Sequence, residues 1–446
     1  MVCQAVNPAP ALSFNLQQQL AETRMQMLSV LGAISPEREA AAKEEYNKGL
    51  QADRDGDQAK AVEHYLRAAE AGYAPAENKV GDCYYYGTGV TKDLAKAFNW
   101  FVKAAQHGYA QAQYNVGFCY LYAKGVTKSE AEAAAWFQRA VDQNHSAAKN
   151  ELGDCYYYGR GVAQDYSKAF VLFREAADAG DTDAQFNLGY CYMYAKGVAK
   201  NEAEAVTWFR RAAEKGHKSA KNELGDCYYY GKGVAQNYGE ALRLFREAAD
   251  LGHTQAQFNV GYCYMYAKGV PKNETEAAVW FRRAADKDHK SAKNELGNCY
   301  YHGRGVAQDY SMAFKLFLEA ADGGNAQAMY NVGYCYAHAK GVAQDYGRAV
   351  TYYEKGAAKG NRSARNALGN CYYYGRGVEL DYTRAAALFE QAAEAGHAYA
   401  QYNTGYCYEY GKGVARDKNK AISWYTKAAD QGNEPAKAAL KRLNGV

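Results

Sequence analysis

The sequence predicts an all-α fold, a solenoid of antiparallel helix pairs built from 36-residue repeats. Three observations support this prediction. A cysteine recurs every 36 residues from Cys83 to Cys407, each time in a Gly-x-Cys-Tyr string, and a fixed period of about 20 to 50 residues is typical of stacked repeats. Apolar residues within each repeat follow helical spacing. Glycine and helix-capping residue types recur where helices would end and begin.

The first helix of each repeat, helix A, is predicted from the specimen at residues 147–180. Its apolar stripe runs through Ala148, Leu152, Cys155 and Tyr156, which is one face of an α-helix. Gly159 ends this helix, because glycine readily adopts the left-handed turn that follows a helix. Gly153 lies mid-helix and is glycine in all ten full repeats. Since a mid-helix glycine costs about 1 kcal/mol relative to alanine, we expect a close helix contact there in which a Cβ would clash.

The second helix, helix B, is predicted to begin at Asp165 and to stop at Gly180. The residue at the N-cap accepts a hydrogen bond from a free backbone N–H of the first turn, and Asp, Asn, Ser and Thr are preferred there. Every counterpart of Asp165 is of such a type: Asp57, Asp93, Ser129, Asn201, Asn237, Asn273, Asp309, Asp345, Asp381 and Asp417. Ala169, Phe173 and Ala176 are expected to point inward from helix B.

The repeat period divides the chain into four segments. Ten full repeats occupy residues 81–440, a degenerate first repeat occupies 45–80, and a C-terminal capping helix is predicted within 435–446. Residues 1–44 do not follow the period and are predicted to hold an N-terminal capping helix. The residues that suggest this helix are Leu16, Leu20, Met27, Leu28 and Leu31. Caps are expected because the end of a solenoid would otherwise expose its core.

The repeat resembles a known family. The string Leu152-Gly153-Asp154-Cys155-Tyr156-Tyr157-Tyr158-Gly159-Arg160-Gly161-Val162, followed by Asp165, Ala169 and Phe173, resembles the Sel-one-like repeat, a relative of the tetratricopeptide repeat. The resemblance covers most of the chain. It implies a right-handed superhelix of antiparallel helix pairs that serves as an adaptor or scaffold, as in membrane-protein quality control or the activation of a chitin synthase. A secreted, cysteine-rich branch of the family, with some members described as β-lactamases, carries two disulfide-bonded cysteines per repeat. This chain has one cysteine per repeat and departs from that branch.

The composition argues against several classes of partner. Lys and Arg number 53 and Asp and Glu 49, a net charge of +4, which gives no electrostatic footprint for nucleic acid or an anionic membrane. The chain shows no secretory signal and no apolar run long enough to span a bilayer. Equivalent positions in stacked helices lie about 8–10 Å apart, beyond the roughly 7 Å between Cα atoms that a disulfide allows. We therefore predict a cytoplasmic protein with reduced thiols.

The candidate partner-binding residues lie on helix A, and they alternate between repeats with a period of 72 residues. Odd repeats place Asn150, Asp154 and Tyr157, and Asn222, Asp226 and Tyr229, at spacing i, i+4, i+7. Even repeats place Phe186, Tyr190 and Met193, and Phe258, Tyr262 and Met265, at the same positions. In tetratricopeptide-like stacks these helices line the concave side. The residues could anchor an extended peptide or a partner helix, or the aromatic side chains could fill gaps between neighbouring A helices.

A basic residue precedes the fixed loop glycine in nine of ten repeats, and these residues are Lys124, Arg160, Lys196, Lys232, Lys268, Arg304, Lys340, Arg376 and Lys412. A cation after a helix C-terminus complements the helix dipole, although an acidic partner or a phosphoinositide would also suit the row. Catalytic motifs are absent from the sequence: there is no phosphate-binding Walker loop, nucleophile elbow or HExxH string. A redox-sensing thiol ladder is the competing chemical interpretation of the cysteines.

These observations predict a non-catalytic scaffold that binds a partner protein or peptide, without a cofactor, metal, nucleic acid or direct membrane insertion. The alternative is a regulatory activator of a membrane-bound enzyme, such as a polysaccharide synthase, or a component of a protein quality-control complex. The sequence makes no prediction about self-association.

Overall fold

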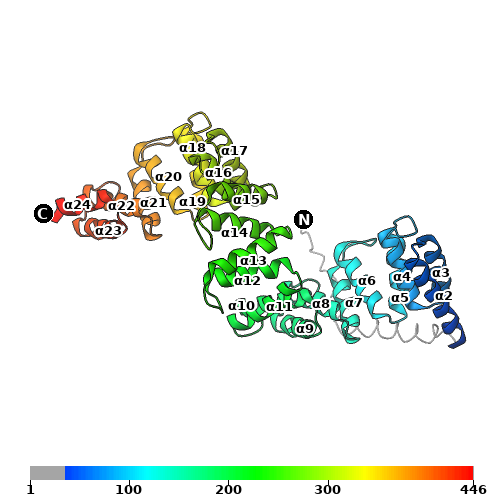
Figure 1. Ribbon diagram of the computed structural model, residues 1–446. Coiled ribbons are helices and arrows are strands. Elements are labelled where there is room, and N and C mark those ends of the chain that lie inside the picture. Colours follow the sequence, from blue (N-terminus) through cyan, green and yellow to red (C-terminus); the bar gives the residue numbers. More distant parts are fainter. Residues whose placement is uncertain (1–35, 445–446) are drawn as a thin grey trace, which may run out of the picture. The chain divides into compact units, whose positions relative to one another are not determined.

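The computed structural model describes residues 36–444 of the chain. Every regular element in that range is an α-helix, which confirms the predicted all-α fold (Figure 1). The N-terminal capping helix predicted from Leu16, Leu20, Met27, Leu28 and Leu31 lies outside the described residues. The helices are α2 (Pro36–Arg54), α3 (Gln58–Glu70), α4 (Ala74–Tyr86), α5 (Leu94–Gln106), α6 (Ala110–Tyr122), α7 (Glu130–Asp142), α8 (Ser146–Tyr158), α9 (Tyr166–Asp178), α10 (Thr182–Tyr194), α11 (Glu202–Glu214), α12 (Lys218–Tyr230), α13 (Tyr238–Asp250), α14 (Thr254–Met265), α15 (Glu274–Ala285), α16 (Lys290–His302), α17 (Tyr310–Asp322), α18 (Ala326–His338), α19 (Tyr346–Ala358), α20 (Arg362–Tyr374), α21 (Tyr382–Glu394), α22 (Ala398–Tyr410), α23 (Lys418–Asp430) and α24 (Glu434–Asn444).

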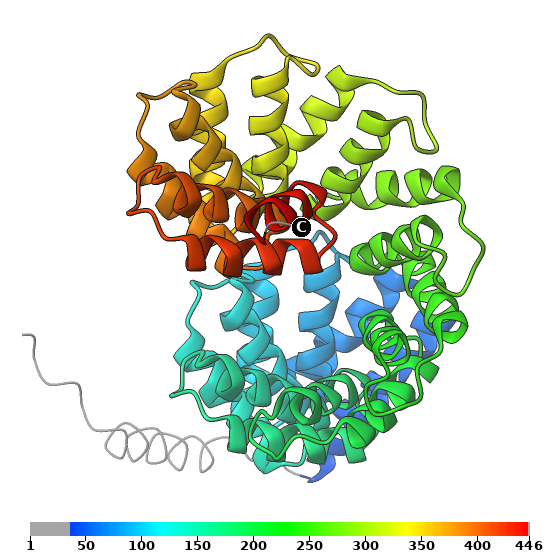
Figure 2. The same cartoon turned by 90° about the vertical axis from the view of Figure 1, so that its left-hand side faces the viewer.

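The helices belong to two units, Met1–His217 and Lys218–Val446. Within each unit, consecutive helices pack against one another (Figure 2). The A helices carry even numbers and the B helices odd numbers. At the C-terminus, α24 packs Ala436 and Ala439 against the buried ring of Tyr425. A helix therefore occupies the segment predicted to cap the stack, and its capping role remains a prediction.

Each helix B begins at its predicted N-cap. The Asp165 carboxylate accepts hydrogen bonds from the backbone N–H groups of Ser167 and Lys168, both at 3.0 Å. All eleven side chains at this position, from Asp57 to Asp417, accept a hydrogen bond from the first turn. The capping pattern therefore located every start of helix B correctly.

The mid-helix glycine of helix A marks the contact with helix B. A Cβ added to Gly153 would lie 2.6 Å from Cε1 of Phe173, a ring that is fully buried. The same clash recurs in unit 2, where a Cβ on Gly225 would lie 2.6 Å from Phe245. The expectation of a close helix contact at this position is therefore confirmed, and the partner is the aromatic ring of helix B.

The fixed loop glycine joins one repeat to the one before it. A Cβ on Gly161 would lie 2.1 Å from the carbonyl oxygen of Glu130, at the start of the preceding helix B. Gly161 also has φ +71°, a conformation that side chains disfavour. Two constraints thus require glycine at this position, and both come from the stacking of neighbouring repeats.

The residue that ends helix A differs between odd and even repeats. In the odd repeat, Gly159 adopts φ 70°. In four of the five even repeats, alanine takes the same left-handed conformation with φ between 52° and 54°, and these residues are Ala123, Ala195, Ala267 and Ala339. Because a left-handed L-residue costs roughly 1–2 kcal/mol, these four even repeats carry a strain that the odd repeats and the last even repeat, which has Gly411, avoid.

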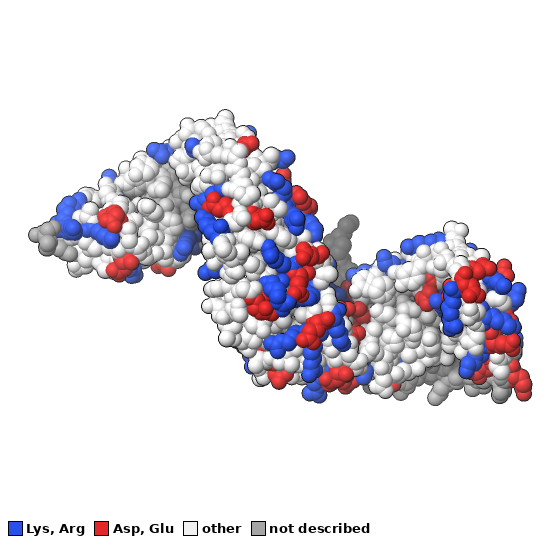
Figure 3. All heavy atoms as spheres, in the orientation of Figure 1, with Lys and Arg blue, Asp and Glu red and all other residues white. Residues whose placement is uncertain are grey.

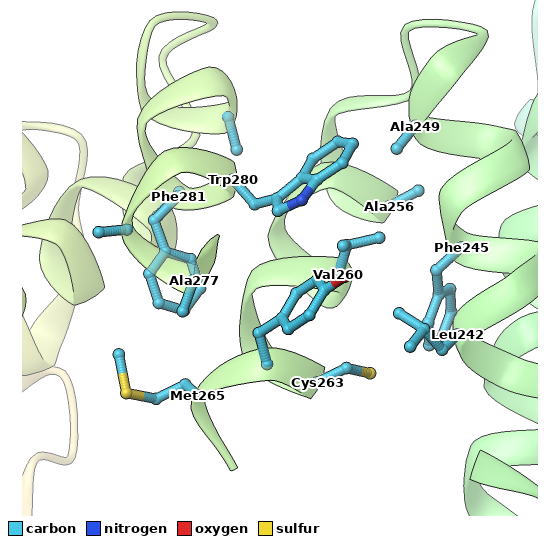
Figure 4. Packing of buried hydrophobic residues seen from close by; sticks show 14 of the residues in the cluster. Leu242, Phe245, Ala249, Ala256, Val260, Cys263, Met265, Ala277, Trp280 and Phe281 are labelled. Carbon is cyan, nitrogen blue, oxygen red and sulfur yellow. The ribbon is translucent and has the colours of Figure 1, made fainter. Parts of the chain in front are cut away.

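The ladder cysteines lie on helix A, between it and the helix B that precedes it in the chain. In Figure 4, Cys263 lies toward Leu242 and Phe245 of the preceding helix B. All ten ladder cysteines are buried free thiols. Burial raises the pKa of the Cys263 thiol to about 12, and a buried thiol that stays protonated is a poor nucleophile. The ladder therefore serves as packing in this structure.

Candidate partner-binding face of the A helices

Hydrogen bonds between asparagines hold neighbouring A helices side by side. In unit 1, Asn187 Nδ2 donates to Asn150 Oδ1 at 3.0 Å, and in unit 2 Asn259 Nδ2 donates to Asn222 Oδ1 at 3.1 Å. The same bond joins Asn115 to Asn78, Asn331 to Asn294 and Asn403 to Asn366. Asn150 and Asn222 are buried by this contact. The sequence had suggested that these two would meet a partner, and the structure uses them instead to align the A helices.

The side chains that face outward define a surface along each unit. On α12 they are Glu223, Asp226 and Tyr230, and on α14 they are Asn259, Tyr262 and Tyr266. We name this surface, at these three positions of every helix A, the A face.

Four of the predicted residues meet around one hollow in unit 2. This hollow, between α12 and α14, has a volume of about 340 Å³. Its walls are formed by Asp226, Tyr229, Tyr230, Phe245, Phe258, Asn259 and Tyr262. The predicted polar residues of the odd repeat and the predicted aromatic residues of the even repeat therefore line the same hollow. We name it the α12–α14 hollow.

The aromatic rings of the hollow differ in how deeply they are buried against other rings. Phe258 lies 5.7 Å from the Phe281 ring and 5.0 Å from the His289 ring, measured between centroids. Tyr229 lies 5.0 Å from Tyr238. Phe258 and Tyr229 are thus partly buried wall residues, whereas Tyr262 is 37% exposed. Phe258 agrees with the gap-filling interpretation, and Tyr262 agrees with the binding interpretation.

The acidic side of the hollow is half-buried. Burial raises the pKa of Asp226 to about 7, and the neighbouring Glu223 raises it further while Lys232 and a bond from Asn222 oppose the rise. That bond runs from Asn222 Nδ2 to Asp226 Oδ2 at 3.3 Å. Among residues 36–444, Asp226 has no ion-pair partner. A carboxylate in this position is poorly solvated and gains strongly from a cation.

Unit 1 repeats the same arrangement between α8 and α10. The rings of Tyr157 and Tyr190 lie 6.5 Å apart, and Phe186 stacks on His217 at 4.8 Å. Burial raises the pKa of Asp154 to about 6. Asp154, Tyr157, Phe186 and Tyr190 therefore repeat the environment of Asp226, Tyr229, Phe258 and Tyr262.

Met193 and Met265 do not join the others. Each is only 5% exposed, and in Figure 4 Met265 lies toward Phe281 within the core. Residues advance by about 100° around a helix, so the seventh residue after Phe258 returns to the core side and the eighth, Tyr266, reaches the A face. Met193 and Met265 were predicted to contact a partner. The structure instead places both side chains in the core.

The sequence-based prediction missed the residue at the eighth position after the Phe258 position of each helix A. This position carries tyrosines exposed by 41% to 72%. They are Tyr86, Tyr122, Tyr158 and Tyr194 in unit 1, and Tyr230, Tyr266, Tyr374 and Tyr410 in unit 2. His302 and His338 occupy the same position in the two remaining repeats and are also exposed. The signal was present as an aromatic residue directly before the helix-ending residue in nearly every repeat.

The basic loop residues pack on tyrosine rings. Lys196 lies 4.6 Å above the Tyr166 ring, and Lys268 lies 4.8 Å above Tyr238. Arg160 lies 4.5 Å above Tyr158. Contact between a cation and an aromatic face is favourable by about 0.5–1 kcal/mol at exposed sites, so the row has a structural role in addition to any effect on the helix dipole.

Several inter-repeat histidines cap the A helices. His145 Nδ1 accepts a hydrogen bond from the Ala148 N–H at 3.2 Å, and His253, His289 and His397 make the equivalent bond. In the part of the chain from residue 36 to 444, no three His, Cys, Asp or Glu side chains are grouped so as to hold a metal ion. Within the same range, no helix is long and apolar enough to cross a membrane.

Acidic and basic side chains are intermixed on the visible surface of both units, with broad uncharged areas between them (Figure 3). This distribution agrees with the small net charge of +4. A uniformly basic surface, as required for binding nucleic acid, is not seen on that face.

Comparisons with known proteins agree on one family. The model of the Sel1 repeat matches eleven consecutive segments that together span residues 39–433. A crystal structure of c5321, a protective antigen present in uropathogenic Escherichia coli strains, is 32% identical with a TM-score of 0.77, over 95% of this chain and 90% of that one. A Sel1 repeat protein from Oxalobacter formigenes is 30% identical with a TM-score of 0.51, over 54% of this chain and 96% of that one. No curated protein matches the chain.

Proposed function

Because the chain belongs to the Sel1 repeat family, we propose that it is a non-catalytic scaffold that binds a partner protein or peptide along the A face. The observation that supports this most directly is the row of exposed tyrosines, which includes Tyr158, Tyr230 and Tyr374. Tyrosine is enriched among the residues that dominate binding energy at protein interfaces. Large exposed aromatic side chains that recur along one surface indicate an interaction site.

The hollow between α12 and α14 gives this surface depth. An extended segment that crosses the A helices would meet an exposed tyrosine, or the histidine on α16 and α18, at successive repeats and could insert a side chain into the hollow. The aromatic walls supply apolar contact area, and the carboxylate of Asp226 supplies a polar contact that fixes orientation. We place the partner on this face for that reason.

A cytoplasmic location is part of the proposal. The ten ladder cysteines are free, and free thiols in this number are typical of reducing compartments. Fractionation of the native cell tests the location, and recovery of the chain outside the cytoplasm would refute it.

A peptide library selected on the full chain tests the binding face. Peptides recovered on the wild type are then measured against a Y158S/Y230S/Y374S variant, which should weaken binding by about tenfold or more because three anchors are lost. The matched control is L251S, since Leu251 is 50% exposed and lies at the C-terminus of α13, which is a helix B. Circular dichroism should be the same for all variants. Equal affinity for the triple variant and the wild type would refute the proposal.

A further inference from the structure

The A face carries two acidic side chains at the α12–α14 hollow. Glu223 and Asp226 lie three residues apart on α12 and therefore on the same side of the helix. Burial raises the pKa of both carboxyls above the usual range. Neither forms an ion pair among the described residues. The Asp226 carboxyl lines the hollow among aromatic rings, with Glu223 one turn earlier on α12, and Lys232 Nζ lies 5.2 Å above the Tyr230 ring without forming an ion pair with either carboxyl.

Packing does not require these acids, as the equivalent positions in two later odd repeats of unit 2 show. We call the A-face positions of one helix A a rung. At the next odd rung, Asn298 replaces the aspartate, and its Nδ2 donates to Glu295 Oε2 at 3.3 Å. At the rung after that, the two positions are Ala367 and Asn370. The tyrosine pairs that flank these rungs are retained, with Tyr301 and Tyr334 6.3 Å apart and Tyr373 and Tyr406 6.4 Å apart. The fold therefore accommodates asparagine at the Asp226 position on both rungs, and alanine at the Glu223 position on α20.

The chemistry of the hollow suits a planar cation. Aromatic faces attract cations, and a guanidinium stacks on such faces while it donates paired hydrogen bonds to carboxylate oxygens. Unit 1 contains a related contact, in which the Arg160 guanidinium lies 4.5 Å above Tyr158. The charge of Arg160 lowers the pKa of Asp154 against the effect of burial. A guanidinium near this carboxyl is therefore favourable in the chain itself.

We propose, on the basis of the scaffold function above, that the α12–α14 hollow binds an arginine side chain of the partner segment, in the way that Arg160 of the chain itself lies on Tyr158 near Asp154 in unit 1. The guanidinium lies against the rings of Tyr230 and Tyr262 and donates to the carboxylates of Glu223 and Asp226. The rungs that carry Asn298 and Asn370 in place of the aspartate do not bind it. The partner is thus an arginine-containing segment whose basic residues select particular rungs.

A labelled tri-arginine peptide tests the proposal on the full chain. Fluorescence anisotropy should show that this peptide binds at least about tenfold more tightly than its tri-citrulline isostere, which has the same shape without the charge. The variant D154N/D226N should lose most of this difference. Both substitutions install the residue that the chain already uses at positions 298 and 370, so the fold is expected to be retained, and circular dichroism checks this.

A matched control separates a specific pocket from a general loss of negative charge. D178N/D250N changes the net charge by the same amount at exposed residues that end helices α9 and α13, and it should reduce tri-arginine binding by less than about twofold. A gain-of-function variant, A367E/N370D, should tighten tri-arginine binding. Equal losses in D154N/D226N and D178N/D250N, or no loss in the first, would overturn the arginine pocket.

The outcome also distinguishes this inference from the function on which it rests. If library-selected peptides lose affinity in Y158S/Y230S/Y374S but are insensitive to D154N/D226N and contain no arginine requirement, the arginine pocket is wrong and the scaffold function stands. If the selected peptides are insensitive to the tyrosine variant as well, both proposals fail.

Discussion

The seam between helix A and helix B of a repeat differs from the A face in how far its residue types vary between repeats. At the seam, the same residue types recur in repeat after repeat, such as the mid-helix glycine at Gly153 and the ring of Phe173 that covers it. On the A face, equivalent positions differ, so that Asp226 on α12 becomes Asn298 on α16. A position that cannot vary without a steric clash reports on stability, and a position that varies over an unchanged backbone is free to encode partner choice. The following predictions test that division.

The largest loss of stability is expected at the loop glycine. Gly161→Ala introduces a Cβ that would overlap the Glu130 carbonyl and also places alanine at φ +71°. We expect a destabilisation of about 3 kcal/mol, since overpacking costs about 1–3 kcal/mol and the left-handed conformation adds to it. The measurement is the urea midpoint by circular dichroism.

Gly108→Ala is the matched control for this substitution. Gly108 has a similar φ of +81°, but a Cβ there would meet nothing within 4 Å. It should therefore lose only the backbone contribution of roughly 1 kcal/mol. If the two variants were equally stable, the stacking of repeats would not depend on the close approach at Gly161.

A moderate loss is expected at the helix B cap. Asp165→Ala removes the acceptor for the Ser167 and Lys168 N–H groups and should destabilise the chain by about 1 kcal/mol. The exposed Asp178, at the other end of α9, provides the comparison through Asp178→Ala. A stability change at Asp178 as large as that at Asp165 would show that charge, and not capping, governs this position. Affinity for a peptide bound on the A face should be the same in both variants.

A small gain is expected where the even repeats are strained. Ala195→Gly relieves a left-handed alanine at φ 54°, and the gain of roughly 1 kcal/mol is partly offset by the greater flexibility of glycine in the unfolded chain. The melting temperature should rise slightly. An unchanged or lower melting temperature would indicate that the alanine methyl group makes a compensating contact.

Some features of the fold could be predicted from the sequence, and others could not. The period, the N-caps and the mid-helix glycine are local signals, and they located helix B and the seam correctly. The outward direction of the A face was harder to predict, because the seventh and eighth residues after Phe258 differ by only one step of the helix. The packing of helix B decides that Met265 is buried and Tyr266 exposed. Long-range pairing, such as the bond from Asn259 to Asn222, has no local signal at all.

The most diagnostic change in stability is expected on the A face itself. The folded-state pKa of Asp226 is about 7, whereas an unfolded aspartate titrates near 3.9. Between these values the folded chain holds a proton that the unfolded chain has released, so stability falls as pH rises through this window and stays lower above it. Asp226→Asn removes that loss, and its melting temperature should exceed the wild type increasingly from about pH 4 to about pH 7, then by a constant amount.

The groups that face Asp226 are retained in this comparison, because Glu223, Lys232 and the His289 that stacks near Phe258 are present in both proteins. A side chain whose replacement stabilises the fold but weakens binding is the expected signature of a residue kept for function at a cost in stability. If Asp226→Asn were less stable than the wild type at about pH 8, the carboxylate would belong to the structure, and the division between the seam and the A face would fail at the rung where it matters most.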